Sequence, residues 1–129
     1  MNINSDLFYT KNDEWVAING NTAIVGITDY AQDALSDIVF VEIVVSAGEL
    51  ITAADNIATV ESVKAASDVY SPVEGTVSET NDSVVNTPEK LNQDPFGSAW
   101  LIKLTNENGF ETSGLMNADA YLKYCEERG

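Results

Sequence analysis

The chain has 129 residues and is strongly acidic, with 21 Asp and Glu residues against six Lys and Arg and a formal net charge of -15. Its 44% hydrophobic content is enough for one core, so we expect a single domain spanning residues 1–129. Nucleic acids and anionic membranes are bound through clustered cations, and the charge balance argues against both partners. The absence of His and the single cysteine, Cys125, argue against an internal disulfide, a zinc cluster and a histidine base.

The N-terminal residues give no targeting signal. Residues 1–6 have neither a basic region nor an apolar one, and no stretch of the chain approaches the length of a membrane span. We therefore expect a cytoplasmic protein, of bacterial type. No segment carries an apolar seam that would have to be covered, which favours a monomer.

The first predicted elements are a β-hairpin and a short helix. Strands at 15–18 and 22–27 flank Asn19-Gly20-Asn21, a strong hairpin signal. Asp29, three residues before Gln32, resembles a helix cap, and the apolar residues that follow it up to Ile38 fall at helical spacing.

The central part of the chain reads as short strands separated by turns. β-branched and aromatic runs predict strands at 39–45, 57–60, 69–71, 75–78 and 100–104, with a turn at Gly48 and a loop at 92–97. Asn117 can cap a C-terminal helix over 118–127, in which we expect Cys125 to be buried. The pattern predicts a mainly β fold, a flattened antiparallel barrel or sandwich with one internal and one C-terminal helix.

Lys64 is the single cationic residue between Lys11 and Lys90. It falls in the predicted connection between two strands, beside Val63 and Ala65, which solvent does not favour. Such an isolated amine is typical of a covalent attachment point. It is also compatible with an ordinary surface lysine that balances nearby carboxylates, and spacing alone does not decide between these interpretations.

A family resemblance bears on that choice. The run Glu61-Ser62-Val63-Lys64-Ala65-Ala66-Ser67-Asp68-Val69-Tyr70-Ser71-Pro72-Val73-Glu74-Gly75 resembles the lipoylation segment of the glycine cleavage H-protein family. Glycines stand 16 residues before and 11 residues after Lys64, at Gly48 and Gly75, as in lipoyl carriers generally, where they set turns. Further similar segments extend the resemblance over essentially the whole chain, at 9–16, 25–32, 39–42 and 92–100.

The resemblance implies the lipoyl/biotinyl-carrier fold, a barrel-sandwich hybrid, with lipoate attached to Lys64 through an amide bond. It implies a carrier without a catalytic group of its own. The lipoyl arm would carry the aminomethyl group of glycine from a pyridoxal-phosphate-dependent glycine decarboxylase to a tetrahydrofolate-dependent aminomethyltransferase. A dihydrolipoyl dehydrogenase would then reoxidise the arm.

The resemblance also assigns roles to three acidic residues. It implies no metal site. Glu61 would serve recognition by the lipoate-attaching enzyme, and Glu14 and Asp68 would surround the amine of the loaded arm. In so acidic a chain, each could equally be an ordinary surface carboxylate.

Several positions depart from the family pattern, and two other functions stay open. Asp13, Ser36, Val44-Val45 and Ala99 replace the frequent His, Gly, Leu-Pro and Gly. An H-like protein that relays lipoyl groups to other acceptors would use Lys64 too, whereas a β-sandwich interaction module would carry no lipoate. Biotin carriers resemble Met-Lys-Met at the attachment site, and lipoyl domains of 2-oxoacid dehydrogenases resemble Asp-Lys-Ala, so both are poorer matches to Val63-Lys64-Ala65.

Overall fold

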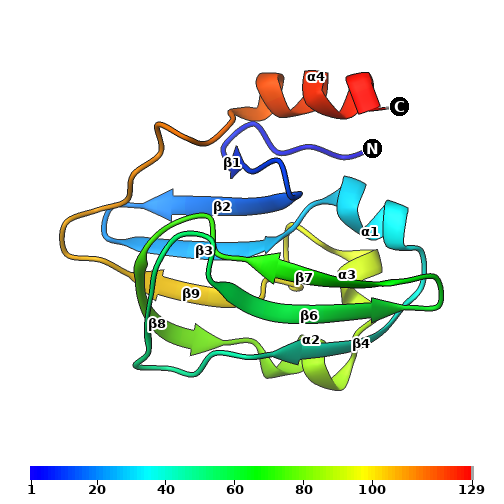
Figure 1. Ribbon diagram of the computed structural model, residues 1–129, viewed down its shortest axis with the longest axis horizontal. Helices are drawn as coiled ribbons and strands as arrows, with labels where there is room; N and C mark the ends of the chain where they lie inside the picture. The colour runs from blue at the N-terminus through cyan, green and yellow to red at the C-terminus, as the bar shows by residue number, and fades with distance from the viewer. Residues whose placement is uncertain (129) are drawn as a thin grey trace.

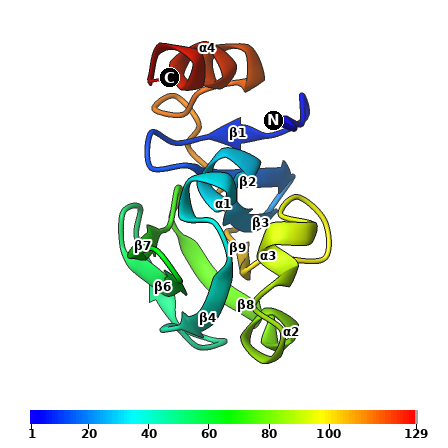
Figure 2. The same cartoon turned by 90° about the vertical axis from the view of Figure 1, so that its right-hand side faces the viewer.

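The computed structural model describes residues 1–128 and places two antiparallel β-sheets face to face (Figures 1 and 2). The larger sheet has the strand order β1-β2-β3-β9-β8-β5, and the smaller sheet has the order β4-β6-β7. The large sheet comprises β1 (Phe8–Tyr9), β2 (Glu14–Asn19), β3 (Thr22–Ile27), β9 (Ile102–Thr105), β8 (Gly75–Thr80) and β5 (Leu50–Ile51). The small sheet comprises β4 (Ile38–Ile43), β6 (Asn56–Ser62) and β7 (Ala66–Tyr70).

Four helices surround the sheets within residues 1–128. The longest, α4 (Ala118–Arg128), lies along the β1 edge of the large sheet (Figure 1). Helix α1 (Asp29–Leu35) leads from the large sheet to the small one. Two short helices, α2 (Asp82–Asn86) and α3 (Lys90–Gln93), lie beside β4 and α1, away from β7 (Figure 2), and contribute Val84 and Leu91 to the core.

The N-terminal hairpin is confirmed, with a small change in its turn. Asn19 pairs with Thr22, so the two turn residues are Gly20 and Asn21. Gly20 has φ +62°, and a glycine with positive φ at the first turn position is the type II′ arrangement. Asn19 therefore ends β2 instead of forming the turn.

The predicted start and end of the first helix are corrected. Thr28, not Asp29, is the N-cap, because its Oγ1 accepts a hydrogen bond from the Ala31 N–H at 3.1 Å. Asp29 lies in the first turn and accepts from Gln32 Nε2 at 2.7 Å. The helix ends at Leu35, and Ile38 continues as the first residue of β4, since apolar spacing alone does not register a break in the backbone.

The remaining predicted strands and the C-terminal helix are confirmed. Asn117 Oδ1 accepts from the Ala120 N–H at 2.9 Å, as expected for a cap, and Cys125 is buried. Two helices were missed, and α3 overlaps the start of the predicted loop at 92–97. Each spans at most five residues, too few for an apolar period to show.

The core lies between the sheets, and a second apolar cluster attaches α4. The core contains β-branched residues from both sheets, with Val16, Val25, Val41 and Val60 among those that are almost completely buried. Within residues 1–128 no strand of one sheet pairs with a strand of the other. The mainly β prediction is confirmed in its sandwich form, and the sheets do not close into a barrel.

Candidate functional site

Lys64 lies at the tip of the hairpin formed by β6 and β7. The tip consists of Val63, Lys64 and Ala65, all exposed, and it projects at one end of the molecule (Figure 1). Ala66 pairs with Glu61, so the strands are in register up to the tip. This position gives the Lys64 amine free access to a large partner.

Ser62 holds the backbone of the tip in shape. Its N–H donates to the Ala65 carbonyl at 2.8 Å, and its hydroxyl donates to the same carbonyl at 3.0 Å. The Ser62 hydroxyl oxygen also accepts from the N–H groups of Lys64 at 3.1 Å and Ala65 at 3.0 Å. A serine side chain thus supplies the local bonds that a tight turn normally takes from Asn or Asp.

The chain that leaves α1 supports the tip from the side. The Val63 N–H donates to the Asp37 carbonyl at 3.0 Å, which joins the tip to the start of β4. Lys64 Nζ donates to the Ala34 carbonyl at 3.3 Å, near the end of α1. This is a single bond from an exposed ammonium to a backbone carbonyl.

Glu61 and Asp68 lie on one face of the small sheet, on neighbouring strands. Glu61 is exposed and pairs with Ala66, one residue from the tip. Asp68 is exposed and pairs with Thr59, whose hydroxyl donates to Asp68 Oδ1 at 3.1 Å. The hairpin therefore brings Glu61 closest to Lys64 along the chain, with Asp68 two positions further from the tip.

Glu14 has a different environment, because it is buried between the sheets with 2% of its surface exposed. Its Oε1 accepts from the Thr10 hydroxyl at 2.5 Å, and its Oε2 accepts from the Tyr70 N–H at 3.1 Å. Burial raises the pKa of the Glu14 carboxyl above its ordinary value, although these two hydrogen bonds act in the opposite direction and the neighbouring Asp13 adds to the rise. The carboxyl thus ties β2 to the end of β7.

Among the four predicted site residues, Glu61 lies nearest Lys64 on the hairpin, and Asp68 lies two positions further from the tip. Glu14 is separated from the tip. Tyr70, the contact of Glu14, stands four strand positions beyond Ala66, or about 13 Å along β7 at the usual rise of a strand. Glu14 therefore lies at the far end of β7 from the Lys64 tip.

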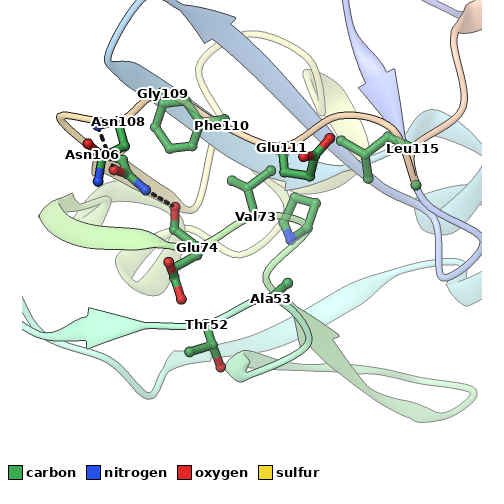
Figure 3. Close-up of a pocket in the computed structure, with 12 residues that line it drawn as sticks. Thr52, Ala53, Val73, Glu74, Asn106, Asn108, Gly109, Phe110, Glu111 and Leu115 are labelled. Carbon is green, nitrogen blue, oxygen red and sulfur yellow. Dashed lines mark hydrogen bonds between the residues drawn. The ribbon is translucent and has the colours of Figure 1, made fainter.

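A cavity of about 740 Å³ opens at the other end of the β6–β7 hairpin. Its walls come from the β5–β6, β7–β8 and β9–α4 connections, with the Phe110 ring and the Glu74 and Glu111 carboxylates around it (Figure 3). Asn106 Nδ2 donates to the Glu74 carbonyl at 3.2 Å and so joins two of the connections. None of the four predicted site residues lines this cavity, which is separate from the Lys64 tip.

The two glycines that flank Lys64 in sequence serve different purposes. Gly48 has φ +94° in the turn before β5, as expected for a turn glycine. Gly75 has no positive φ and starts β8, and a Cβ there would lie 2.9 Å from the Thr105 carbonyl oxygen on β9. The expectation that both set turns is therefore wrong for Gly75, which is required by the close approach of two strands.

The residues that depart from the family pattern differ in backbone conformation, contacts and burial. Asp13 has φ +69° and forms an ion pair with Arg128, with 2.7 Å between Oδ1 and Nη2. Ser36 ends α1 with φ +60°, a conformation that favours the Gly common at that position. Val45 and Ala99 are buried, Val45 in the core between the sheets.

Sequence reasoning missed the residues that shape the tip. Ser62 lies within the motif, but the resemblance gives it no role, and the supporting carbonyls of Ala34 and Asp37 carry no side-chain signal at all. A serine two residues before the lysine is the one feature that pattern analysis could have used, because serine commonly bonds to nearby backbone N–H groups.

Comparison with known proteins decides the family. A family model described as glycine cleavage H-protein matches residues 7–128. This chain belongs to the glycine cleavage H-protein family. Its sequence is 46% identical over 127 residues to the glycine cleavage system H protein of Halothermothrix orenii, covering 98% of both chains. The Thermus thermophilus H protein is 44% identical over 126 residues, with 98% of both chains covered.

The fold agrees with that of a solved H protein. The crystal structure of the glycine cleavage system H protein from Mycobacterium marinum matches with a TM-score of 0.83 and 32% sequence identity, covering 98% of this chain and 99% of that one. The resemblance inferred from the residues is thereby confirmed. The H-protein fold exposes the Lys64 tip at one end of the molecule, and within residues 1–128 no helix is long and apolar enough to cross a bilayer.

Proposed function

We propose that this protein is the lipoyl-carrying shuttle of a glycine cleavage system, with lipoate bound through an amide to Lys64. The observation that carries the proposal is an exposed lysine at the tip of a hairpin, in a member of the H-protein family. When bound, the lipoyl disulfide accepts the aminomethyl group of glycine from the decarboxylase and is reduced in the process, for delivery to the aminomethyltransferase.

The residues around Lys64 fit a covalently attached arm. The tip is solvent-exposed, so an enzyme can reach the amine, and the Ser62 hydrogen bonds fix the backbone from which the side chain departs. Displacement of the Nζ bond to the Ala34 carbonyl costs little, because water can replace the lysine as donor at an exposed site. The protein's contribution is tethering, which raises the effective concentration of the arm at each docked partner.

The acidic residues receive separate proposals. Glu61, which is exposed beside the tip, would be recognised by the lipoate-attaching enzyme. Asp68 would attract the amine carried by the loaded arm. Glu14 would do so only if the amine reaches its buried carboxyl, each oxygen of which already accepts one protein donor and has a further acceptor site. Loss of protection of the loaded arm in Glu14→Ala, with unchanged protection in Glu126→Ala at an exposed position of α4, would support that role.

The wider assignment follows from the same carrier role. We propose one lipoyl-carrier domain over residues 1–129, acting as a monomer in the cytoplasm without a catalytic group of its own. Its partners would be the glycine decarboxylase, the aminomethyltransferase, dihydrolipoyl dehydrogenase and the lipoate-attaching enzyme.

Intact mass after expression in a lipoate-competent host tests the attachment. We expect wild type and Lys123→Arg, a change at an exposed lysine of α4, to gain one lipoyl increment, and Lys64→Arg to gain none. A wild-type protein without the increment would contradict the proposal. Glycine-dependent bicarbonate exchange with purified glycine decarboxylase then tests the shuttle role, because a protein that only relays lipoyl groups would be modified but would not support exchange.

A further inference from the structure

The outward side of the small sheet combines apolar and acidic side chains. Residues directly opposite each other on neighbouring antiparallel strands share a face of the sheet. Two such rows cross β4, β6 and β7, whereas Val41 and Val60 between them are buried. We define the outer face as the residues of these two rows, Phe40–Glu61–Ala66 and Glu42–Thr59–Asp68.

Large apolar side chains are exposed at the Lys64 end of this sheet. Phe40 is 46% exposed, Val39 beside it is 58% exposed, and Val63 in the tip is 70% exposed. The hydrogen bond from the Val63 N–H to the Asp37 carbonyl holds Val63 beside the start of β4, and so near Val39. Single exposed apolar residues are ordinary, but a group of three next to a modification site is typical of a contact surface.

The charge of the outer face selects the chemistry of the partner. Glu42, Glu61 and Asp68 are exposed carboxylates, and neither row contains a cation. Such a face is complementary to a partner surface that has an apolar pocket with Lys and Arg residues at its rim. A second copy of this chain would bring like charges together, in a molecule whose net charge is already -15.

The position of the face selects the partner. Of the proposed partners, the lipoate-attaching enzyme alone has to act on Lys64 Nζ, whereas the others act on the far end of the arm. In the attachment step Nζ forms an amide with an activated lipoyl acyl donor. The bond from the acyl carbon to the leaving group breaks, the leaving group takes the electron pair, and the ammonium gives up two protons. The enzyme must therefore contact the protein directly beside the tip.

We propose that the outer face, with Val39 and Val63, is the docking surface for the lipoate-attaching enzyme. Phe40 and Val63 pack into an apolar pocket on that enzyme. Glu42 and Asp68 pair with Lys or Arg side chains around that pocket. The proposal rests on the proposed function and adds to it the surface by which the unmodified protein is recognised.

Binding and modification are measured separately to test this surface. The probe is a purified lipoate ligase supplied with lipoate and ATP, with intact mass as the readout of modification. Titration calorimetry with Lys64→Arg, which cannot be modified, gives the Kd without turnover. Phe40→Ser and Val63→Ser are compared with Leu122→Ser on α4 and Val85→Ser on α2, which remove exposed apolar side chains elsewhere.

We expect Phe40→Ser and Val63→Ser each to raise KM and Kd on the order of tenfold, because both lose apolar contact at the centre of an interface. The two control variants should stay within about twofold of wild type. Glu42→Lys should weaken binding, and added salt should weaken wild-type binding as well. Urea unfolding establishes that each variant is folded.

Three results would overturn the proposal. Equal KM and Kd in the face variants and the controls, with wild type modified normally, would reject the surface alone. A wild type that the ligase does not modify would reject the proposed function together with the surface. A dimer of the unmodified protein that Phe40→Ser abolishes would assign the face to a second copy of the chain.

Discussion

Glu14 is the buried member of the four predicted site residues. Its carboxyl accepts one hydrogen bond from Thr10 on the approach to β2 and one from Tyr70 at the end of β7. A buried acceptor that loses its donors, or a buried donor that loses its acceptor, costs about 1–3 kcal/mol. Glu14 therefore helps to hold the two sheets together, because its hydrogen bond to Tyr70 joins β2 to β7.

The raised pKa of the Glu14 carboxyl makes its contribution to stability depend on pH. As the pH rises from the ordinary Glu pKa to the raised one, the native state keeps a proton that the unfolded state has lost, so stability falls across that interval. Glu14→Gln cannot ionise but can still accept from the Tyr70 N–H and donate to Thr10. We therefore expect this variant to gain stability relative to wild type between about pH 5 and about pH 8.

Urea unfolding at the two pH values measures this difference, with Glu42→Gln as the exposed control. Both values lie above the pI of about 4.1, where the protein would lose solubility. A relative stability of Glu14→Gln that stays constant with pH, or falls, would show that burial of the carboxyl does not control its titration.

At the scale of the elements, the C-terminal end of α1 supports the Lys64 tip. α1 ends at Leu35, and its C-cap residue Ser36, with φ of +60° and ψ of -145°, turns the chain toward β4. That turn carries the Asp37 carbonyl to the Val63 N–H, and it presents the Ala34 carbonyl to Lys64 Nζ. The end of a helix thus supports the tip of a hairpin 30 residues later in the chain, the separation between Ala34 and Lys64.

The serine at the end of α1 is strained, because a side chain disfavours its backbone conformation. We expect Ser36→Gly to raise the free energy of unfolding by about 0.5–1 kcal/mol, since relief of strain is partly offset by the greater freedom of glycine in the unfolded chain. Urea unfolding is the measurement. Ser46→Gly, at an exposed loop serine outside the positive-φ region, should instead destabilise. A loss of stability in both variants would contradict the assignment of strain to Ser36.

At the scale of the whole molecule, the two ends of the chain are joined along the β1 edge. Tyr9 of β1 stacks on Tyr121 of α4 with 4.5 Å between ring centroids. The Tyr121 hydroxyl donates to Asp13 Oδ1 at 2.8 Å, and the Arg128 guanidinium donates to both oxygens of Asp13. Hydrogen bonding to Asp13 raises the pKa of the Arg128 guanidinium, and burial raises the pKa of the Tyr121 hydroxyl. Arg128 also lies 4.1 Å from the Tyr124 ring centroid.

Removal of the Arg128 charge tests how firmly α4 is attached. We expect Arg128→Gln to lower the free energy of unfolding by about 1–2 kcal/mol, a value reduced for the partial exposure of the pair. Urea unfolding measures the loss, which should shrink in high salt because the pair is partly screened. Lys123→Gln, an exposed cation on the same helix, is the control, and an equal effect of both changes would exclude a specific role for the Asp13 pair.

Local chemistry along the sequence was sufficient to locate most strands, the N-terminal hairpin, the C-terminal helix and the connection that carries Lys64. Alternation of apolar residues, turn glycines and helix caps act over a few neighbours, so they are readable without the fold. Only the tertiary structure decided that Glu14 is buried, that Asp13 pairs with Arg128 and that Gly75 serves a close approach of strands. The contacts involved join residues 56 and 115 positions apart, for Tyr70 with Glu14 and for Arg128 with Asp13. Such contacts arise from the packing of the sheets and α4, which no local pattern encodes.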